Sequence, residues 1–324
     1  MRAQVVPVPT MLPAIVSILG GLVLLALGAE GLVRGSSSIA LRMGVTPLVI
    51  GLTIVAFGTG SPQMIVSLQA ALAGSSDLAL GNIVGSNIAN IALILGLSAL
   101  ARPLHVRSAL LLREAPVMIG VTVLLVVLLL DGELGRLDGA LLTAGAVTYT
   151  IGTYLASRRE RNAEVAAEFA REMREPKAST GRSVALVLAG FAGLLAGAHV
   201  LVAGAVTIAQ ALGMSEVVIG LTVIAIGTSL PELATSVVAA MRNDADVAFG
   251  NVLGSNILNI LLILGVVALI QPMSGTGLRT LDLGAMVASA ALLYPLLWRG
   301  RILNRWEGGL LLAGYVTYVV FALR

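Results

Sequence analysis

Short runs of small polar residues recur in both halves of an otherwise apolar sequence. The second half contains GTSLPE at 227–232 and GNVLGSNILN at 250–259, and the first half contains GTGSPQ at 58–63 and GNIVGSNIAN at 81–90. Carboxylate, hydroxyl, amide and backbone carbonyl oxygens are the ligands that hard cations such as Na⁺ and Ca²⁺ prefer. The chain has no cysteine and two histidines, which argues against a zinc or copper site. The polar runs therefore predict a site for a hard cation.

The first run of each half is expected to bend its helix and to free backbone oxygens. Pro62 and Pro231 lack an N–H, so each removes a bond to the carbonyl four residues earlier. Freed carbonyls near Thr59 and Thr228 must find partners inside a bilayer, and a bound cation is one such partner. Glu232 follows Thr228 by one helical turn, which places its carboxylate on the same face.

The second run of each half places three polar side chains at i, i+4 and i+8 on one helix. They are Asn251, Ser255 and Asn259 in the second half and Asn82, Ser86 and Asn90 in the first. Such side chains can bind a cation or can join helices by hydrogen bonds. Both interpretations are open for four asparagines, namely Asn82, Asn87, Asn251 and Asn256. For Glu232 we favour a functional role, because an unpaired carboxylate deep in a bilayer costs several kcal/mol.

Transmembrane helices must carry these runs. Apolar residues make up 57% and charged residues 11% of the 324 residues, with a mean hydropathy of +0.98, whereas soluble domains carry roughly a quarter charged residues. Spans made of long apolar runs are helices rather than barrel strands. Ten spans are expected, at about 12–33, 45–73, 78–100, 108–130, 137–156, 183–211, 215–241, 247–271, 281–298 and 306–323.

An internal repeat divides the chain into two halves. A shift of 169 residues aligns Gly51–Leu100 with Gly220–Leu269 without a gap and with 26 identities in 50 positions. Five helices per half is an odd number, so the second copy must insert upside down. We predict an all-α integral membrane fold of ten transmembrane helices as two inverted five-helix repeats, at 1–157 and 183–324, joined by a linker at 158–182. Such repeats are typical of secondary transporters, whose site lies between the repeats near mid-membrane.

The distribution of basic residues predicts the orientation. With the N-terminus outside, sixteen Lys and Arg residues lie in or beside cytoplasmic loops and four lie outside. The positive-inside rule therefore predicts a multi-pass protein of the cell (inner) membrane, with both termini outside and the 158–182 loop in the cytoplasm. This topology role explains the sequence pI near 9.7 without nucleic-acid binding.

The two copies resemble the α-repeats of the cation/calcium exchanger superfamily, closest to its prokaryotic sodium/calcium exchangers. The family pattern is GTSxPE followed by GNxxGSN in both halves; the second half matches it fully, and the resemblance spans essentially the whole chain. It implies exchange of Na⁺ for Ca²⁺ by alternating access, with these ions as transported ligands and no cofactor. Carried over residue by residue, it implies a site of Thr228, Glu232, Ser229, Ser255, Asn259 and the Ala225 carbonyl, with Thr59, Gln63, Ser86, Asn90 and the Ala56 carbonyl.

Two residues of the first half depart from the family pattern. Gln63 replaces a glutamate and Gly60 replaces a serine; Ser61 does not substitute, since one helical step turns it about 100° away. A dication beside Glu232 alone keeps one net positive charge, which costs at least a few kcal/mol in a low-dielectric site. We therefore expect weak Ca²⁺ binding or a preference for a monovalent ion, and fewer coupled Na⁺ per cycle.

Two other functions stay open at this point. Protonation of Glu232 could replace sodium in a cation/proton exchanger, or lost ligands could leave an uncoupled cation channel or sensor. An enzyme is not expected, because the sequence has no nucleophile–base pair, phosphate loop or HExxH motif. The expected partners are the lipid bilayer and inorganic cations, not nucleic acid, and the chain is expected to act as a monomer.

Overall fold

The computed structural model of the chain describes residues 8–43, 45–108, 110–159, 179–213 and 225–322. These residues form helices and four strands of two residues each. Six helical segments among them are long and apolar enough to cross a membrane, or seven if the bent pair Pro47–Thr59 and Ser61–Leu72 counts as one span. Most of the predicted linker and the beginning of the predicted 215–241 span lie outside the described residues.

The first half begins with a long helix, which is followed by a bent helical run, a second run and a helix pair. Its elements are α1 (Val8–Met43), α2 (Pro47–Ile50), η1 (Gly51–Val55), α3 (Ala56–Thr59), α4 (Ser61–Leu72), α5 (Ser76–Ala89), η2 (Asn90–Leu95), α6 (Gly96–Ala101), β1 (Leu104–His105), η3 (Leu110–Glu114), α7 (Ala115–Leu128), η4 (Leu129–Asp131), β2 (Glu133–Leu134) and α8 (Arg136–Arg159).

The second half repeats this order where it is described. Its elements are α10 (Thr180–Ala211), α12 (Ala225–Thr228), α13 (Leu230–Met241), α14 (Ala245–Leu258), η6 (Asn259–Leu264), α15 (Gly265–Ile270), β3 (Met273–Ser274), α16 (Thr280–Trp298), β4 (Ile302–Leu303) and α17 (Arg305–Ala322).

Two antiparallel strand pairs join the halves and are images of each other. Leu104 pairs with Leu303 in β1–β4, and Leu134 pairs with Met273 in β2–β3. Adding 169 to 104 gives 273, and adding 169 to 134 gives 303, so the repeat shift converts one pair into the other. Reciprocal contacts between two copies are the signature of a twofold axis. The halves are therefore related by an approximate twofold axis.

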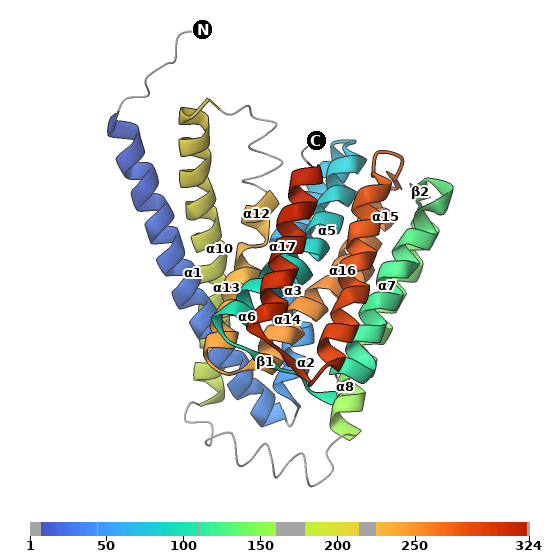
Figure 1. The fold of residues 1–324 in the computed structure, drawn as a ribbon, viewed down its shortest axis with the longest axis horizontal. Coiled ribbons are helices and arrows are strands. Elements are labelled where there is room, and N and C mark those ends of the chain that lie inside the picture. The colour runs from blue at the N-terminus through green and yellow to red at the C-terminus, as the bar shows by residue number, and fades with distance from the viewer. Residues whose placement is uncertain (1–7, 44, 109, 160–178, 214–224, 323–324) are drawn as a thin grey trace.

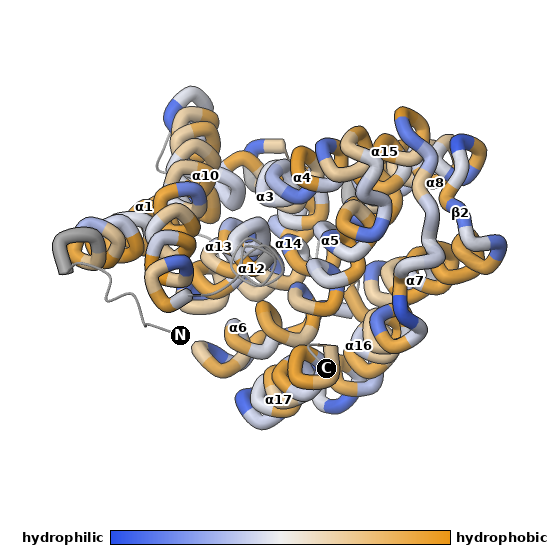
Figure 2. The backbone as a smooth tube through the Cα atoms, turned by 90° about the horizontal axis from the view of Figure 1, so that it is seen from above, coloured by the Kyte–Doolittle hydropathy of each residue, from blue (hydrophilic) through white to orange (hydrophobic). Residues whose placement is uncertain are grey.

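The two central segments carry the second polar runs. They comprise α5, η2 and α6 in the first half and α14, η6 and α15 in the second, and 78% of the most apolar stretch of each is buried. Figure 2 shows α5 and α14 near the middle of the molecule, with α1 and α10 together at one side. The polar runs therefore lie in the protein interior and not against lipid.

Helices α1 and α10 lie against each other as a layer beside the rest of the bundle (Figure 1). Glycines permit this contact: a Cβ at Gly28 would lie 2.6 Å from the Leu194 backbone nitrogen, and a Cβ at Gly190 would lie 2.6 Å from that of Leu32. Close backbone approach at small residues is how membrane helices associate without a hydrophobic driving force between them.

The last helix of each half packs on the opposite half. Helix α8 lies against α15, and α17 lies against α6. A Cβ at Gly139 of α8 would lie 2.8 Å from the carbonyl oxygen of Gly265, and a Cβ at Gly308 of α17 would lie 2.8 Å from that of Gly96. The two halves are therefore intertwined.

Candidate cation site

Both predicted helix breaks are present. Helix α3 ends at Thr59 and α4 begins at Ser61, and the helical runs on the two sides meet at 46°. In the second half α12 ends at Thr228 and α13 begins two residues later. Pro62 and Pro231 lie in the first turns of α4 and α13, where the missing N–H would have no helical partner.

The breaks bring Gln63 and Glu232 together in the interior. The Gln63 amide Nε2 donates to Glu232 Oε1 at 2.8 Å, and both residues are 0% exposed. Within the described part of the chain, no Lys, Arg or His forms an ion pair with Glu232. A neutral amide therefore holds the carboxylate, and no basic side chain of these residues balances its charge.

Five of the predicted site residues carry a buried side-chain oxygen without a hydrogen-bond partner among the described residues. These oxygens are Gln63 Oε1, Asn90 Oδ1, Glu232 Oε2, Ser255 Oγ and Asn259 Oδ1. Each buried, unpaired polar atom costs about 1–3 kcal/mol. A hard cation would satisfy several such oxygens at once.

The remaining predicted residues lie on the same breaks and central segments. Thr59 Oγ1 donates to Asn251 Oδ1 at 3.1 Å, which joins the first break to α14. The others are Ala56 at the start of α3, Ser86 in α5, Ala225 at the start of α12, Thr228 at its end, and Ser229 between α12 and α13. The fold thus gathers every predicted site residue on four neighbouring segments.

Asn82 and Asn251 join helices within each half. Asn82 Nδ2 donates to Ser67 Oγ at 3.0 Å, and Asn251 Nδ2 donates to Ser236 Oγ at 2.9 Å. Each amide also donates to the backbone oxygen of the residue four positions before that serine. The serines were not predicted as part of this network, although their identity in the two copies, one turn after Gln63 and Glu232, was a usable signal.

Asn87 and Asn256 join the two halves reciprocally. Asn87 Nδ2 donates to the Asn256 carbonyl and Asn256 Nδ2 donates to the Asn87 carbonyl, both at 3.2 Å. Asn90 Nδ2 donates to Asn256 Oδ1, and Asn259 Nδ2 donates to Asn87 Oδ1, both at 2.9 Å. The structure therefore shows the helix-joining role for Asn87 and Asn256, while Asn90 and Asn259 keep their Oδ1 atoms free of described partners.

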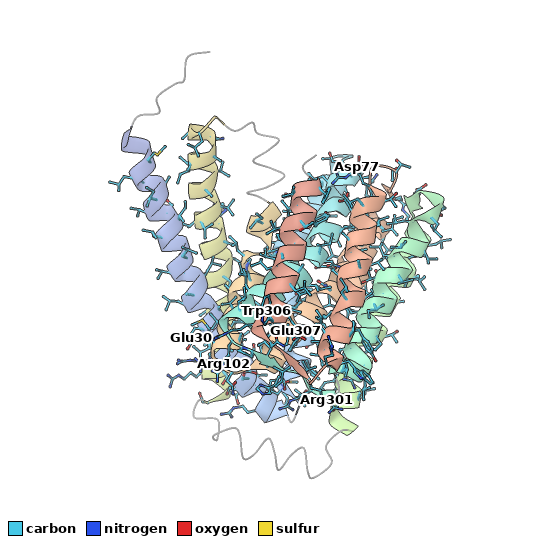
Figure 3. All side chains as sticks on the ribbon, in the orientation of Figure 1. Glu30, Asp77, Arg102, Arg301, Trp306 and Glu307 are labelled. Atoms are coloured by element: carbon cyan, nitrogen blue, oxygen red, sulfur yellow. The ribbon has the colours of Figure 1, made fainter. Side chains whose placement is uncertain are left out.

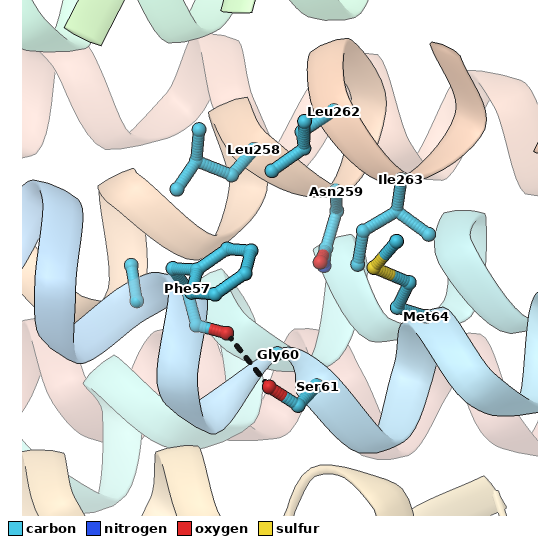
Figure 4. Close-up of a pocket in the computed structure, with 9 residues that line it drawn as sticks. Phe57, Gly60, Ser61, Met64, Leu258, Asn259, Leu262 and Ile263 are labelled. Carbon is cyan, nitrogen blue, oxygen red and sulfur yellow. Dashed lines mark hydrogen bonds between the residues drawn. The ribbon is translucent and has the colours of Figure 1, made fainter. Parts of the chain in front are cut away.

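A small cavity of about 10 Å³ lies beside the first break (Figure 4). Gly60 lines it, and a Cβ there would lie 3.0 Å from the Ala56 carbonyl oxygen and 3.7 Å from Asn259 Oδ1. The Ser61 hydroxyl does not fill this place, because it donates to the Phe57 carbonyl oxygen at 3.1 Å. Ser61 also lines this cavity, and the expectation that it does not replace the missing serine stays a prediction.

Comparison with known proteins gives consistent matches over nearly the whole chain. The sodium/calcium exchanger protein family matches residues 13–155 and 182–324. The chain is 43% identical over 319 residues to CaxA of Alkalimonas amylolytica, which covers 95% of this chain and 98% of that protein. It is 37% identical over 318 residues to the inner membrane protein YrbG of Escherichia coli K12, which covers 95% and 96%.

A solved structure of the sodium-calcium exchanger NCX_Mj, soaked with Na⁺ and Ca²⁺, has the same fold. Its TM-score is 0.83 at 34% sequence identity, and the match covers 96% of this chain and 98% of that one. The doubled polar motif, the paired helix breaks and these matches agree. The chain therefore belongs to the sodium/calcium exchanger protein family, whose members are membrane transporters.

Proposed function

We propose that the chain is a sodium-driven calcium antiporter whose mid-membrane site depends on one carboxylate, Glu232. The observation that carries the proposal is the state of this side chain. It is fully buried, its Oε2 is unpaired and no described basic residue balances it, while its Oε1 accepts from Gln63, whose own Oε1 is also unpaired. A bound cation would supply both the charge and the missing partners.

The remaining ligands would come from both halves. Backbone carbonyls at the two breaks are those of Ala56, Thr59, Ala225 and Thr228, and side-chain oxygens are those of Ser86, Asn90, Ser229, Ser255 and Asn259. Free oxygens on Asn90, Ser255 and Asn259 support this assignment. These groups are hard ligands that suit Na⁺ and Ca²⁺.

Alternating access would use ten helices arranged as two inverted repeats. The first five are α1, the bent run 47–72, the run 76–101, η3 with α7, and α8, and the second half repeats this order. The reciprocal asparagine bonds and the paired strands support a twofold axis between the copies. Such a pair of repeats can rock about a fixed site. In the proposed orientation both termini lie outside and the 158–182 loop lies in the cytoplasm.

The first half of this site would be weak. Gln63 contributes no charge, and its amide occupies one oxygen of the only carboxylate in the pair. Gly60 leaves a cavity where a hydroxyl would reach toward the Ala56 carbonyl. Weak Ca²⁺ binding and fewer coupled Na⁺ ions per cycle would follow.

Radiolabelled Ca²⁺ uptake into reconstituted vesicles tests the proposal. Parallel assays impose gradients of Na⁺, K⁺ or H⁺, and compare the wild type with Glu232→Gln and with Glu133→Gln, which removes an exposed carboxylate from β2. We expect uptake that follows the Na⁺ gradient, is lost in Glu232→Gln and is retained in Glu133→Gln.

Each other outcome points to a different function. Uptake that ignores Na⁺ and follows the pH gradient would indicate the cation/proton exchanger. Flux without any counter-ion would indicate an uncoupled channel. Transport retained in Glu232→Gln would show that the site lies elsewhere.

A further inference from the structure

The connection between α16 and α17 differs chemically from its twofold image between α7 and α8. Residues 298–307 read WRGRILNRWE, with three arginines and one glutamate, for a net charge of +2. Residues 129–138 read LLDGELGRLD, with one arginine and three acidic residues, for a net charge of −2. Both tryptophans of the chain lie in the basic connection and none lies in its image. The same backbone position thus carries opposite charge and different aromatic content.

A groove opens next to the basic connection, on the outer surface between α16 and α17. Its volume is about 380 Å³, and its lining includes Leu296, Leu310 and Ala313 along the helices, with Arg299, Trp306 and Glu307 at one end. A Cβ at Gly309, which also lines it, would meet no atom within 4 Å. In the ten-helix arrangement proposed above this groove faces the hydrocarbon region, and an acyl chain is the occupant that its apolar part fits.

Guanidinium groups without a described partner lie at or beside the polar end of the groove. Among the described residues, the guanidinium groups of Arg299 and Arg305 have no hydrogen-bond or ion-pair partner, and Arg299 is the one that lines the groove. The Glu307 carboxylate is already engaged, since it accepts from the Asn304 backbone nitrogen at 2.9 Å in a reciprocal cap. Arg299 and Arg305 outnumber this one carboxylate, so the charge at this end of the groove is net positive.

The exposed side chain of Trp306 indicates at which depth in the bilayer the polar end of the groove lies. Trp306 is 87% exposed, and Figure 3 shows it with Glu307, Arg102 and Arg301 in the lower half of the molecule, whereas Asp77 lies near the top. Tryptophan prefers the headgroup level of a bilayer, where its ring is apolar and its N–H is wet. Arg299 and Trp306 therefore lie where a lipid phosphate would lie if the acyl chain followed the groove.

The twofold-related groove position provides an internal comparison. Subtracting 169 places Leu130 where Arg299 lies and Leu137 where Trp306 lies, and these leucines are 78% and 87% exposed. The backbone therefore does not require arginine or tryptophan at these positions. A topology signal explains the arginines and the interfacial preference of tryptophan explains Trp306, but neither explains the groove.

We propose that the groove between α16 and α17 binds an anionic phospholipid, with its phosphate on Arg299 beside Trp306 and one acyl chain along Leu296, Leu310 and Ala313. Arginine near a membrane surface attracts anionic headgroups, and basic pockets between helices bind them. In the orientation proposed above this lipid belongs to the cytoplasmic leaflet. The binding itself does not depend on cation coupling, so its test is independent of the transport assays.

Native mass spectrometry of the full chain in detergent tests the site with two probes, phosphatidylglycerol and zwitterionic phosphatidylethanolamine. The double variant Arg299→Leu/Trp306→Leu installs the residues of the twofold-related position, which the fold already tolerates in exposed places. Arg136→Leu, at the image of Arg305, is the matched loss of one arginine at the other connection. We expect the double variant to bind phosphatidylglycerol about fivefold more weakly or worse, while Arg136→Leu and phosphatidylethanolamine binding stay unchanged.

A gain-of-function variant keeps the test decisive if the first variant folds poorly. Leu130→Arg/Leu137→Trp should add phosphatidylglycerol binding at the other connection. Unchanged phosphatidylglycerol binding in the Arg299→Leu/Trp306→Leu protein, at an unchanged melting temperature, would overturn the proposal. An equal loss of both lipids would also overturn it, because the groove would then hold acyl chains without regard to headgroup.

Discussion

The side-chain amide of Gln63 donates to the carboxylate of Glu232 at 2.8 Å, and these two residues occupy equivalent positions 169 residues apart in the two copies. At a twofold-symmetric site, two identical carboxylates would repel and would both need a cation. Here one member is neutral and donates a hydrogen bond to the other. The hydrogen bond therefore holds the pair together without an ion. A cation that binds here meets a single negative charge, that of Glu232, and must compete with the Gln63 amide for it.

Gln63→Glu should restore the second carboxylate. We expect Ca²⁺ affinity to rise at least about tenfold, because the added charge removes the uncompensated positive charge of the bound dication. Radiolabelled Ca²⁺ uptake as a function of Ca²⁺ and Na⁺ concentration measures this. Gln69→Glu, the same substitution at an exposed position of α4, is the matched control. Unchanged affinity and unchanged sodium steepness in Gln63→Glu would contradict the weak half-site.

Gly60→Ser should supply an oxygen to the cavity beside the first break. The hydroxyl would reach toward the Ala56 carbonyl and Asn259 Oδ1, so we expect half-maximal sodium activation at about fivefold lower Na⁺, the effect of one added polar contact of about 1 kcal/mol. Sodium-dependent uptake measures it. Gly60→Ala fills the same space without an oxygen and should not give the gain; equal effects of both variants would assign the change to packing.

Asn256→Leu should destabilise the fold. The substitution leaves the Asn87 carbonyl and the Asn90 amide without the partners that Asn256 provides, and each buried unpaired group costs about 1–3 kcal/mol. Thermal unfolding in detergent should show a lower melting temperature, and Asn87→Leu should behave alike because the bonds are reciprocal. Gln271→Leu, which removes an exposed amide, is the control. A large loss in one variant and none in the other would argue against the symmetric network.

Asp244→Asn should stabilise the protein at neutral pH. Asp244 lies between α13 and α14, outside the spanning segments, and burial raises its pKa above the usual value, although the hydrogen bond from Ser37 at 2.6 Å acts in the opposite direction. A raised folded-state pKa gives stability that is complete below the unfolded-state pKa and is lost as pH rises through the folded-state pKa.

Melting temperatures of the wild type and Asp244→Asn at several pH values measure this linkage. The variant should melt higher at pH 7, and the difference should shrink as the pH falls to about 3, below the unfolded-state pKa of about 3.9, where the wild-type carboxyl is mostly protonated in both states. A variant that melted lower than the wild type at pH 7 would mean that nearby Arg107 and Arg242 dominate and that burial does not.

The breaks and the site segments were predictable from residue types alone. Proline at 62 and 231 removes an N–H, and this requirement is local, so the breaks after Thr59 and Thr228 follow without any tertiary information. The family resemblance is also confirmed, because a doubled motif at a fixed shift leaves few alternatives.

The division of labour among the asparagines was not predictable. Whether an amide faces a neighbouring helix or the site depends on helix rotation, which spacing does not define. The structure directs Asn87 and Asn256 into each other's backbone and leaves oxygens of Asn90 and Asn259 unpaired. The π-helical turns η2 and η6, which begin at Asn90 and Asn259, were missed for the same reason. A π-turn is a local bulge in an α-helix that depends on tertiary contacts, and no residue type in the sequence predicts it.

The exchange of final helices between the halves has a consequence for biosynthesis. Helix α6 is synthesised long before α17. Until α17 is present, the face of α6 around Gly96 lacks its protein partner and is exposed to lipid. A fragment that ended after α8 would lack α15, the helix against which α8 packs. The contact between α6 and α17 can therefore form only after residues 305–322 have been synthesised.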